Sequence, residues 1–410
     1  MADVFLAWEL GGGMGHVVPL SQLTQALVRR GHHVHLALRD LSGAPAALGG
    51  LRDSPQVKLW QAPMWLPALH GAPQPVSYPE LLFHAGYLDP ARLMPLVQAW
   101  RQVMQAAAPA LLVADHAPTA LLASRGLPMR RAQLGTGFFL PPRQTPMPAF
   151  REWERVDPAR LASSEAQALA TCNAVLGRLG QAPLGALQTL FDTDETFALT
   201  WPELDHYSPG PQGRAGVRYW GTLPGRDQGA AAAWPAGDGA RVFVYLKSDY
   251  PGIDTLLQVL SQGPWRCLAY VPGLTPAQRQ RVASGGRLLF STAPVSMTQA
   301  LAEADAVLCN AGSGTVCTAL QAGVPVLMLP MHAEQMLFAR RVVATGAGGY
   351  LLESDAGARL AATLDRLLGD PAFRQRARAL AASHADTAAG DVAEHMADRC
   401  SELAHMPPTG

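Results

Sequence analysis

Short apolar runs alternate with stretches of helical periodicity twice along this 410-residue chain, and this alternation limits the fold more than any other feature. The first series opens with an apolar run at 4–8, a helical stretch at 17–30 and an alternating run at 33–38. Strand, helix and strand in this order predict a parallel sheet with right-handed crossovers. Because the chain is too long for one ordinary core, we expect two α/β domains.

A segment rich in glycine, alanine and proline, residues 208–239, separates the two series. Further strands are expected before it at 110–114 and 197–200, and after it at 242–246, 267–271, 288–290, 306–309 and 326–329. Its composition is typical of a linker. We predict an N-terminal domain over 1–215, a linker over 216–240, a C-terminal domain over 241–390, and a last segment over 391–410 whose helix packs back on the N-terminal domain.

Composition and charge exclude several classes of function. The formal net charge is zero and basic residues are scattered, so we expect no nucleic-acid partner. The five cysteines show no metal-ligand spacing, and no apolar run is long enough to span a bilayer. With no basic leader at the N-terminus, a cytoplasmic enzyme with reduced thiols is expected. Peripheral membrane contact and the oligomeric state stay open.

The strongest local signal is the segment 306–335, AVLCNAGSGTVCTALQAGVPVLMLPMHAEQ. It predicts a strand, a loop of small residues, a helix beginning near Gly314, a turn, a buried strand and a polar loop. Small residues let a ligand approach the backbone, and a helix N-terminus presents unpaired N–H groups that favour a phosphate. The simpler alternative, a capped helix after a tight turn, explains the glycines but not the whole array.

This segment resembles the donor-binding signature of the UDP-glycosyltransferase superfamily, in particular its bacterial antibiotic glycosyltransferases. The resemblance rests on the loop 310–315, on Gly323, Val324 and Pro325, and on Glu334 followed by Gln335. It implies the α/β GT-B fold, in which two Rossmann-like domains with doubly wound parallel sheets face a central cleft. It also implies that the nucleotide sugar binds the C-terminal half and the acceptor binds the N-terminal half.

The resemblance assigns the donor contacts by position. The residues expected at the diphosphate are Ser248, Asn310, Gly312, Ser313, Gly314 and Thr315. Glu334 and Gln335 are expected at the sugar, with a solvated loop acid as the alternative for Glu334. Ala293, Pro294 and Val295 are expected at a uracil or thymine base. Asn310 stands where the family has a histidine. An asparagine amide donates a hydrogen bond but never carries a positive charge, so Lys247 or an arginine is the alternative source of charge.

The N-terminal glycine cluster carries the candidate catalytic base. Its glycines do not fit a dinucleotide fingerprint, because the third glycine would fall on His16. The pattern of Gly15, His16 and Pro19 instead resembles the start of the same glycosyltransferases, where this histidine is the base. Asp115, at the end of a later strand, is its expected orienting partner, and the adjacent His116 could substitute in either role. A histidine in such a loop is otherwise often a packing residue.

The resemblance implies an inverting transfer of a hexose from a UDP- or dTDP-sugar to an acceptor hydroxyl, without cofactor or metal. The nucleotide sugar is then a co-substrate. We expect Trp65, Tyr78 and Phe138 to line the acceptor site, which suits a small apolar or aromatic molecule. Two alternatives stay open: an epimerase or hydrolase of sugar nucleotides on the same fold, and a non-catalytic binder of nucleotide sugars.

Overall fold

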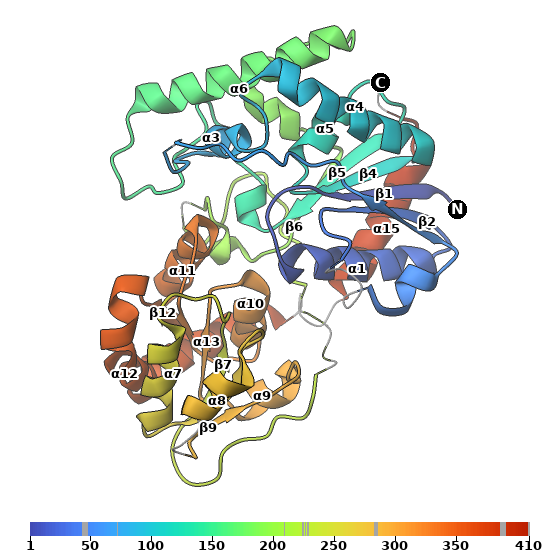
Figure 1. Ribbon diagram of the computed structural model, residues 1–410. Coiled ribbons are helices and arrows are strands. Elements are labelled where there is room, and N and C mark those ends of the chain that lie inside the picture. The colour runs from blue at the N-terminus through green and yellow to red at the C-terminus, as the bar shows by residue number, and fades with distance from the viewer. Residues whose placement is uncertain are drawn as a thin grey trace. The chain divides into compact units, whose positions relative to one another are not determined.

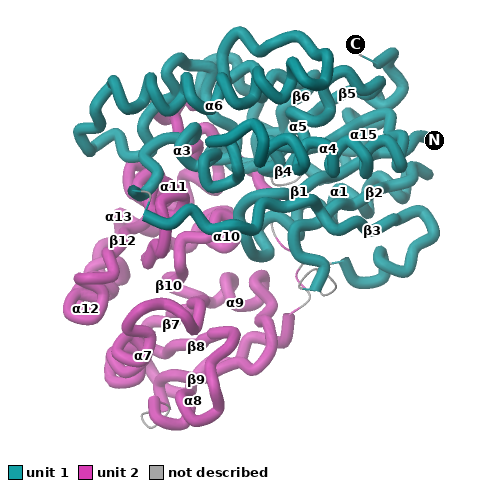
Figure 2. The backbone as a smooth tube through the Cα atoms, turned by 45° about the horizontal axis from the view of Figure 1, so that its top comes forward, with its two compact units in different colours: residues 1–200, 214–220, 391–410 teal, residues 201–213, 221–390 magenta. Residues whose placement is uncertain are grey.

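The computed structural model describes residues 1–42, 48–71, 73–208, 210–223, 225, 227, 229–282, 286–385 and 391–408. The chain divides into two compact units, which Figure 2 distinguishes by colour. Unit 1 comprises Met1–Thr200, Arg214–Trp220 and Asp391–Gly410, and unit 2 comprises Trp201–Gly213 and Gly221–Gly390.

Unit 1 is built on a parallel sheet of six strands in the order β3-β2-β1-β4-β5-β6. The strands are β1 (Asp3–Trp8), β2 (His33–Leu38), β3 (Val57–Gln61), β4 (Leu111–Asp115), β5 (Arg130–Gly135) and β6 (Glu195–Ala198). The strand order reverses between β1 and β4, and the loops after these two strands therefore begin side by side.

Helices flank this sheet, with α1 and α4 on opposite sides in Figure 1. The helices of unit 1 are α1 (Met14–Arg29), α3 (Tyr78–Phe83), α4 (Pro90–Ala107), α5 (Pro118–Ser124), α6 (Pro158–Arg178) and α15 (Val392–His405), with short 3-10 helices at Gly49–Asp53, Gly137–Phe139 and Leu187–Phe191. Helix α1 buries Val17, Leu20 and Leu27 along one face, as its helical periodicity predicts.

Helix α15 belongs to unit 1 although it comes last in the chain. Asp391 caps its N-terminus by accepting from the backbone N–H groups of Ala393 and Glu394. The helix packs against α1, where Arg30 is 2.7 Å from Asp398 and also pairs with Glu394.

Unit 2 repeats the same topology in the order β12-β11-β10-β7-β8-β9. Its strands are β7 (Arg241–Tyr245), β8 (Arg266–Tyr270), β9 (Leu288–Phe290), β10 (Ala306–Cys309), β11 (Val326–Met328) and β12 (Gly348–Tyr350). Its helices are α7 (Ile253–Gln262), α8 (Pro276–Val282), α9 (Met297–Glu303), α10 (Ser313–Gln321), α11 (Ala333–Thr345), α12 (Glu353–Gly369) and α13 (Pro371–Ser383), with a 3-10 helix η4 at Pro202–Leu204.

Both faces of the second sheet are covered, because alternate side chains of a strand point to opposite faces. On β7, Val242 and Val244 join the core cluster that holds α7 residues, whereas Phe243 joins the cluster that holds Val316 and Leu320 of α10. Strands buried on both sides read as continuous apolar runs, which is why the sequence reveals them clearly.

The boundary between the units differs from the sequence prediction at one segment. Trp201–Gly213, expected in the N-terminal domain, groups with unit 2. The reason is packing: the Trp201 ring stacks on His384 at 4.4 Å, the His206 ring stacks on Phe338 at 5.5 Å, and Arg341 donates to the His206 carbonyl. Most of the expected linker, from Gly221 onward, also groups with unit 2.

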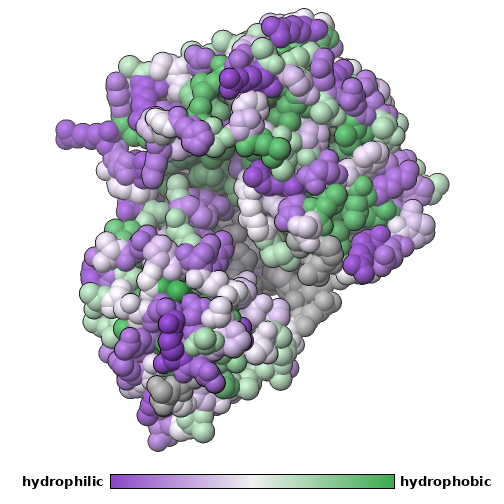
Figure 3. Space-filling model, viewed as in Figure 1, coloured by the Kyte–Doolittle hydropathy of each residue, from purple (hydrophilic) through white to green (hydrophobic). Residues whose placement is uncertain are grey.

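None of the helices in the described part of the chain is long and apolar enough to cross a membrane. Figure 3 shows hydrophilic residues spread over the visible face of both units.

Candidate functional site

The reversal of strand order in unit 1 brings together the residues that the sequence singled out for catalysis. Trp8 and Asp115 are register partners at the ends of β1 and β4. His16 lies in the first turn of α1, just beyond the glycine loop that follows β1. Ligands of open α/β sheets bind beyond the carboxyl ends of the strands at such a reversal.

His16 and Asp115 form a buried pair. His16 Nδ1 is 3.0 Å from Asp115 Oδ1, and both side chains are almost fully buried. Burial raises the pKa of the Asp115 carboxyl, and the neighbouring His16 opposes that shift. A carboxylate at Nδ1 favours the tautomer that carries its proton there, so the Nε2 atom is the basic nitrogen. The structure thus brings together the two predicted residues in the expected geometry.

Aromatic rings enclose the His16 imidazole. Trp8 stacks on it at 5.3 Å, Phe139 lies 4.8 Å away, and the His116 ring lies 6.1 Å away. These rings exclude water from one side of the pair, which strengthens the electrostatic interaction between imidazole and carboxylate.

Gly11 passes close to the reactive nitrogen of His16, and the sequence analysis gave it no role. Its φ is +81°, and a Cβ added to it would lie 2.5 Å from His16 Nε2. Only glycine combines this backbone conformation with this proximity. The signal available in the sequence was the glycine cluster itself, which also fits several other loop types.

We expect Gly11→Ala to reduce transfer activity at least tenfold, because the methyl group would clash with the His16 imidazole at Nε2 and displace it from Asp115. Gly31→Ala is the matched control: Gly31 also has a φ of +81°, but an added Cβ there meets nothing within 4 Å. Both variants carry the backbone strain, about 1–2 kcal/mol, and only the first crowds His16. Equal activity in the two variants would contradict this role for Gly11.

Glu9, directly after β1, is a second residue that the sequence analysis missed. It is buried, and burial raises the pKa of its carboxyl to about 7. Its Oε2 accepts from the Thr119 backbone N–H at 2.8 Å. The available signal was an acidic residue immediately after an apolar strand, which is weak without knowledge of the strand order.

The three predicted acceptor residues lie in unit 1 but differ in exposure. Trp65 is half-buried and lies under Gly86. Tyr78 and Phe138 are only 1% and 4% exposed, so both side chains fill the core here, and their contact with an acceptor stays a prediction. Tyr78 packs against Phe191, and Phe138 packs against Phe150. Burial of these rings in the core removes more apolar surface from water than a position in a solvated loop would.

In unit 2 the predicted diphosphate loop follows β10 and leads into α10. Ala311 has a φ of +57°, and Gly312 is the N-cap residue without a side-chain hydrogen bond. Ser313 and Thr315, in the first turn, are partly exposed, as is Gly312, and Gly314 is exposed. The first turn of a helix presents N–H groups without intrahelical partners, so this loop offers the backbone donors and hydroxyls that an anion requires.

Asn310 joins neighbouring loops in the structure, and its predicted contact with the diphosphate stays a prediction. Its Oδ1 accepts from the Lys247 backbone N–H at 2.7 Å, and its Nδ2 donates to the Leu329 carbonyl at 3.0 Å. The residue is buried. The amide therefore joins the loops that follow β7, β10 and β11, and both of its polar groups are engaged within the protein.

The remaining predicted donor residues lie at the ends of the same strands. Ser248, after β7, is partly exposed and lies beside Gly273, whose added Cβ would be 2.5 Å from Ser248 Oγ. Glu334, in the first turn of α11, is partly exposed. The Gln335 side chain is buried and its Oε1 accepts from the Met331 backbone N–H, so this side chain also braces its own loop.

The residues predicted at the nucleotide base are also partly exposed and partly buried. Ala293 and Pro294 are exposed, whereas Val295 is buried in a core cluster. The Pro294 carbonyl accepts from the Ala230 N–H. The Val295 side chain fills the core, and contact of these three residues with a base stays a prediction.

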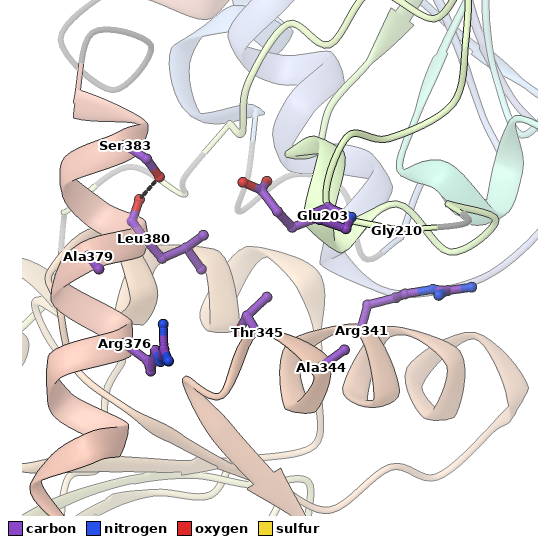
Figure 4. A pocket seen from close by; sticks show the side chains of 10 residues that line it. Glu203, Gly210, Arg341, Ala344, Thr345, Arg376, Ala379, Leu380 and Ser383 are labelled. Atoms are coloured by element: carbon purple, nitrogen blue, oxygen red, sulfur yellow. Dashed lines mark hydrogen bonds between the residues drawn. The ribbon is translucent and has the colours of Figure 1, made fainter.

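A separate cavity of about 340 Å³ lies elsewhere in unit 2, between α11, α13 and η4. Figure 4 shows Thr345 and Arg376 beside it, with Glu203 of η4 opposite. None of the predicted site residues lines it. Glu203 is 3.0 Å from His384. Burial opposes the shift, but the hydrogen bond with His384 lowers the pKa of the Glu203 carboxyl.

Comparisons with known proteins agree with this fold. Residues 280–403 match the family described as erythromycin biosynthesis protein CIII-like, C-terminal domain. The zeaxanthin glucosyltransferase of Pseudescherichia vulneris is 36% identical over 110 residues, which are 27% of this chain and 26% of that protein. The chain thus spans about a quarter of the length of this curated relative.

Two solved structures match almost the whole chain. The calicheamicin glycosyltransferase CalG4 has a TM-score of 0.71 at 19% identity and covers 98% of both chains. The glycosyltransferase SsfS6 of Streptomyces sp. SF2575, complexed with thymidine diphosphate, has a TM-score of 0.65 at 18% identity and covers 98% of this chain and 100% of its own.

Two parallel sheets of this topology, each with its polar residues at the carboxyl edge, define a GT-B protein, and the predicted fold is confirmed. Within that class, residues 280–403 match the erythromycin biosynthesis protein CIII-like C-terminal domain family, and the relatives are named glycosyltransferases. The predicted resemblance is therefore confirmed as well.

Proposed function

We propose that this protein is an inverting, metal-independent glycosyltransferase that moves a hexose from a UDP- or dTDP-sugar to a hydroxyl of a small apolar or aromatic molecule. The observation that carries the proposal is the buried pair of His16 and Asp115, in contact through Nδ1 at the reversal of strand order. A neutral imidazole held in one tautomer by a carboxylate is suited to general-base catalysis.

In the proposed reaction, His16 Nε2 removes the proton of the acceptor hydroxyl as that oxygen attacks the anomeric carbon. The bond from that carbon to the diphosphate oxygen breaks, and its electron pair leaves with the nucleoside diphosphate. Asp115 stabilises the imidazolium that forms. The N–H groups at the start of α10 stabilise the negative charge of the leaving group, so the proposal requires no metal.

The donor half of the proposal rests on the loop 312–315 and on Ser248. Their partly exposed hydroxyls and the uncapped helix N-terminus form an anion-binding arrangement. The neighbour SsfS6 was solved with thymidine diphosphate, which supports a nucleoside diphosphate here. The five cysteines are unpaired and buried, which fits a cytoplasmic enzyme.

We expect UDP or dTDP to raise the free energy of unfolding of the protein. The gain is about 2.7 kcal/mol at a ligand concentration of one hundred times the dissociation constant. Thr315→Val should weaken this binding about tenfold, because it removes a hydroxyl from the first turn of α10 and keeps the shape. Thr318→Val is the control: its hydroxyl donates to the Gly314 carbonyl within the helix, and its loss should leave affinity unchanged. Calorimetry measures both.

The two alternatives give different outcomes in the same assays. An epimerase or hydrolase would consume the nucleotide sugar without an acceptor, and a non-catalytic binder would be stabilised by it without any turnover. Transfer that requires both donor and acceptor, with inversion at the anomeric carbon detected by NMR, supports the proposal over both.

A further inference from the structure

Glu9 lies directly after β1, and its carboxyl group is buried inside unit 1. The side chain is 1% exposed. Its Oε2 atom accepts from the backbone N–H of Thr119, in the first turn of α5, at 2.8 Å, and its Oε1 atom is also shielded from solvent. Burial of a carboxylate costs free energy unless its contacts compensate for the lost water, so this position at the edge of the sheet points to a role beyond packing.

Two hydrogen bonds continue the pairing of β1 and β4 past the ends of these strands. The Leu10 N–H donates to the His116 carbonyl at 3.0 Å. The bond from Thr119 to Glu9 adds a second link, further along the segment that follows β4. Because the loop after β1 leads to His16, these links fix the approach to His16 against the segment after β4.

The segment that Glu9 holds is strained directly beside Asp115. The next residue, His116, has a φ of +43°, in the left-handed region that residues with side chains rarely adopt. Such a conformation persists only where neighbouring contacts hold it. Because His116 follows Asp115 in the chain, the contacts that hold this conformation also set the direction in which the Asp115 carboxylate points toward His16.

The groups around Glu9 allow its carboxyl to change charge near neutral pH. Burial raises the pKa of Glu9 to about 7, against the smaller effects of the hydrogen bonds with Thr119 and the charge of Arg39. Arg39, which follows β2, also donates to the Glu9 carbonyl at 2.9 Å. Tyr87 contacts Thr119 Oγ1 at 3.1 Å, and burial raises the pKa of Tyr87 well above its ordinary value, so it stays neutral. The titratable groups on the side of the site are His16, Asp115 and His116.

We propose that Glu9 is a positioning residue for catalysis, whose ionised carboxylate holds the segment after β4 so that Asp115 meets His16. This inference rests on the proposed glycosyltransferase function and adds a dependence on pH to it. Charge-assisted hydrogen bonds are about twice as strong as neutral ones, so a protonated Glu9 holds the Thr119 N–H less firmly. Asp115 then moves relative to His16, and proton transfer to His16 slows because it depends on the position of the imidazole.

Glu9 is expected to affect stability and activity in opposite directions as the pH rises. A pKa raised from 4.5 to about 7 means that the folded state binds the proton more tightly than the unfolded state. The contribution of Glu9 to stability is therefore fully present below pH 4.5 and is lost as the pH rises through about 7. Activity needs the ionised form and increases over the same range. A residue that only stabilises the fold would change both in the same direction.

The test is Glu9→Gln, assayed with dTDP-glucose and UDP-glucose as donors and 2-phenylethanol as the acceptor probe. Glutamine keeps an oxygen that accepts from the Thr119 N–H but never ionises, so it imitates the protonated form. We expect the kcat of the variant to equal that of the wild type at pH 5.5 and to be about tenfold lower at pH 8.5. The ionisation of His16 is common to both proteins and cancels in this ratio. The melting temperature of the variant, relative to that of the wild type, should be higher at pH 8.5 than at pH 5.5.

Two controls separate this role from general damage to the protein. The acceptor 4-nitrophenol is ionised at pH 8.5 and needs no base, so the loss in Glu9→Gln should disappear with it. Asp194→Asn removes another carboxylate that accepts from a backbone N–H, that of Arg131 at 2.9 Å, but at the opposite edge of the same sheet, where β5 and β6 begin. This variant should leave kcat unchanged at both pH values. Affinity for UDP or dTDP should stay the same in both variants.

The outcomes are distinguishable. A Glu9→Gln variant as active as the wild type at both pH values would overturn the role of Glu9 and leave the proposed function intact. An equal loss at both pH values, or with both acceptors, would do the same, because it would mean that Glu9 only supports the fold. A wild-type protein that transfers no sugar from either donor to either acceptor would overturn both.

Discussion

His16→Ala is expected to lower transfer about 100- to 10,000-fold while the affinity for UDP or dTDP stays within twofold of the wild type. The reason is the division of labour between the units: the pair of His16 and Asp115 lies in unit 1, and the anion-binding loop 312–315 lies in unit 2. Steady-state kinetics and calorimetry on the same preparation measure the two quantities. A variant that retains more than a tenth of wild-type turnover would contradict general-base catalysis by His16.

The acidity of the acceptor provides an internal control for this prediction. A phenol that is already ionised at the assay pH, such as 4-nitrophenol under alkaline conditions, needs no base, so the loss in His16→Ala should be much smaller with it than with 2-phenylethanol. Asp115→Asn should also impair transfer, and its loss should be non-additive with that of His16→Ala, because the two residues act as one unit. Additive losses would show that they act independently.

The sequence predicted the strands with a clear apolar pattern and missed three strands without one. The runs at 33–38, 288–290 and 306–309 coincide with β2, β9 and β10, and most of the other expected strands differ by one or two residues at each end. Strands β3, β5 and β12 were missed. Their sequences, VKLWQ, RRAQLG and GGY, mix charged, polar or glycine residues into the strand, whereas the edge strand β9 was predicted because its sequence, LLF, is apolar throughout.

The sequence predicted those site residues whose position follows from the end of a single strand or the start of a single helix. Asp115 ends an apolar run and His16 opens a helix, and the carboxyl ends of parallel strands share one edge of a sheet, so their meeting followed from the fold class. Burial of Tyr78, Phe138 and Val295 did not follow, because it depends on packing between segments far apart in the chain. Pattern alone cannot separate an aromatic residue that lines a site from one that fills a core.

The family resemblance and the structure assign different roles to Asn310. The family resemblance places this residue at the diphosphate, where a histidine would add a charged donor and tighten binding at low pH. The structure instead uses its amide to join three loops, through the Lys247 N–H and the Leu329 carbonyl. We therefore expect Asn310→Leu, which keeps the size but leaves both backbone groups unpaired, to lower the free energy of unfolding by about 2–4 kcal/mol.

Asn310→His distinguishes a contact with the diphosphate from a role in joining the loops, because the two roles predict opposite effects of low pH on the variant. A neutral imidazole has one acceptor and one donor nitrogen, so it can replace both bonds of the amide, whereas an imidazolium cannot accept from the Lys247 N–H. The fold thus favours the neutral form and holds the pKa of the introduced imidazole below its unfolded value of about 6.5. A depressed pKa means that the unfolded state binds more protons, so stability is present above that value and is lost as the pH falls.

Relative to the wild type, Asn310→His should therefore unfold more readily at pH 6 than at pH 8, as measured by denaturant titration at both values. Its affinity for UDP or dTDP should fall together with its stability, because the loop 312–315 follows two residues after Asn310, whose amide holds this segment to the loops after β7 and β11. Tighter nucleotide binding at pH 6 than at pH 8, without loss of stability, would be the opposite result. It would show that residue 310 acts on the diphosphate and that the two hydrogen bonds of the Asn310 amide are dispensable.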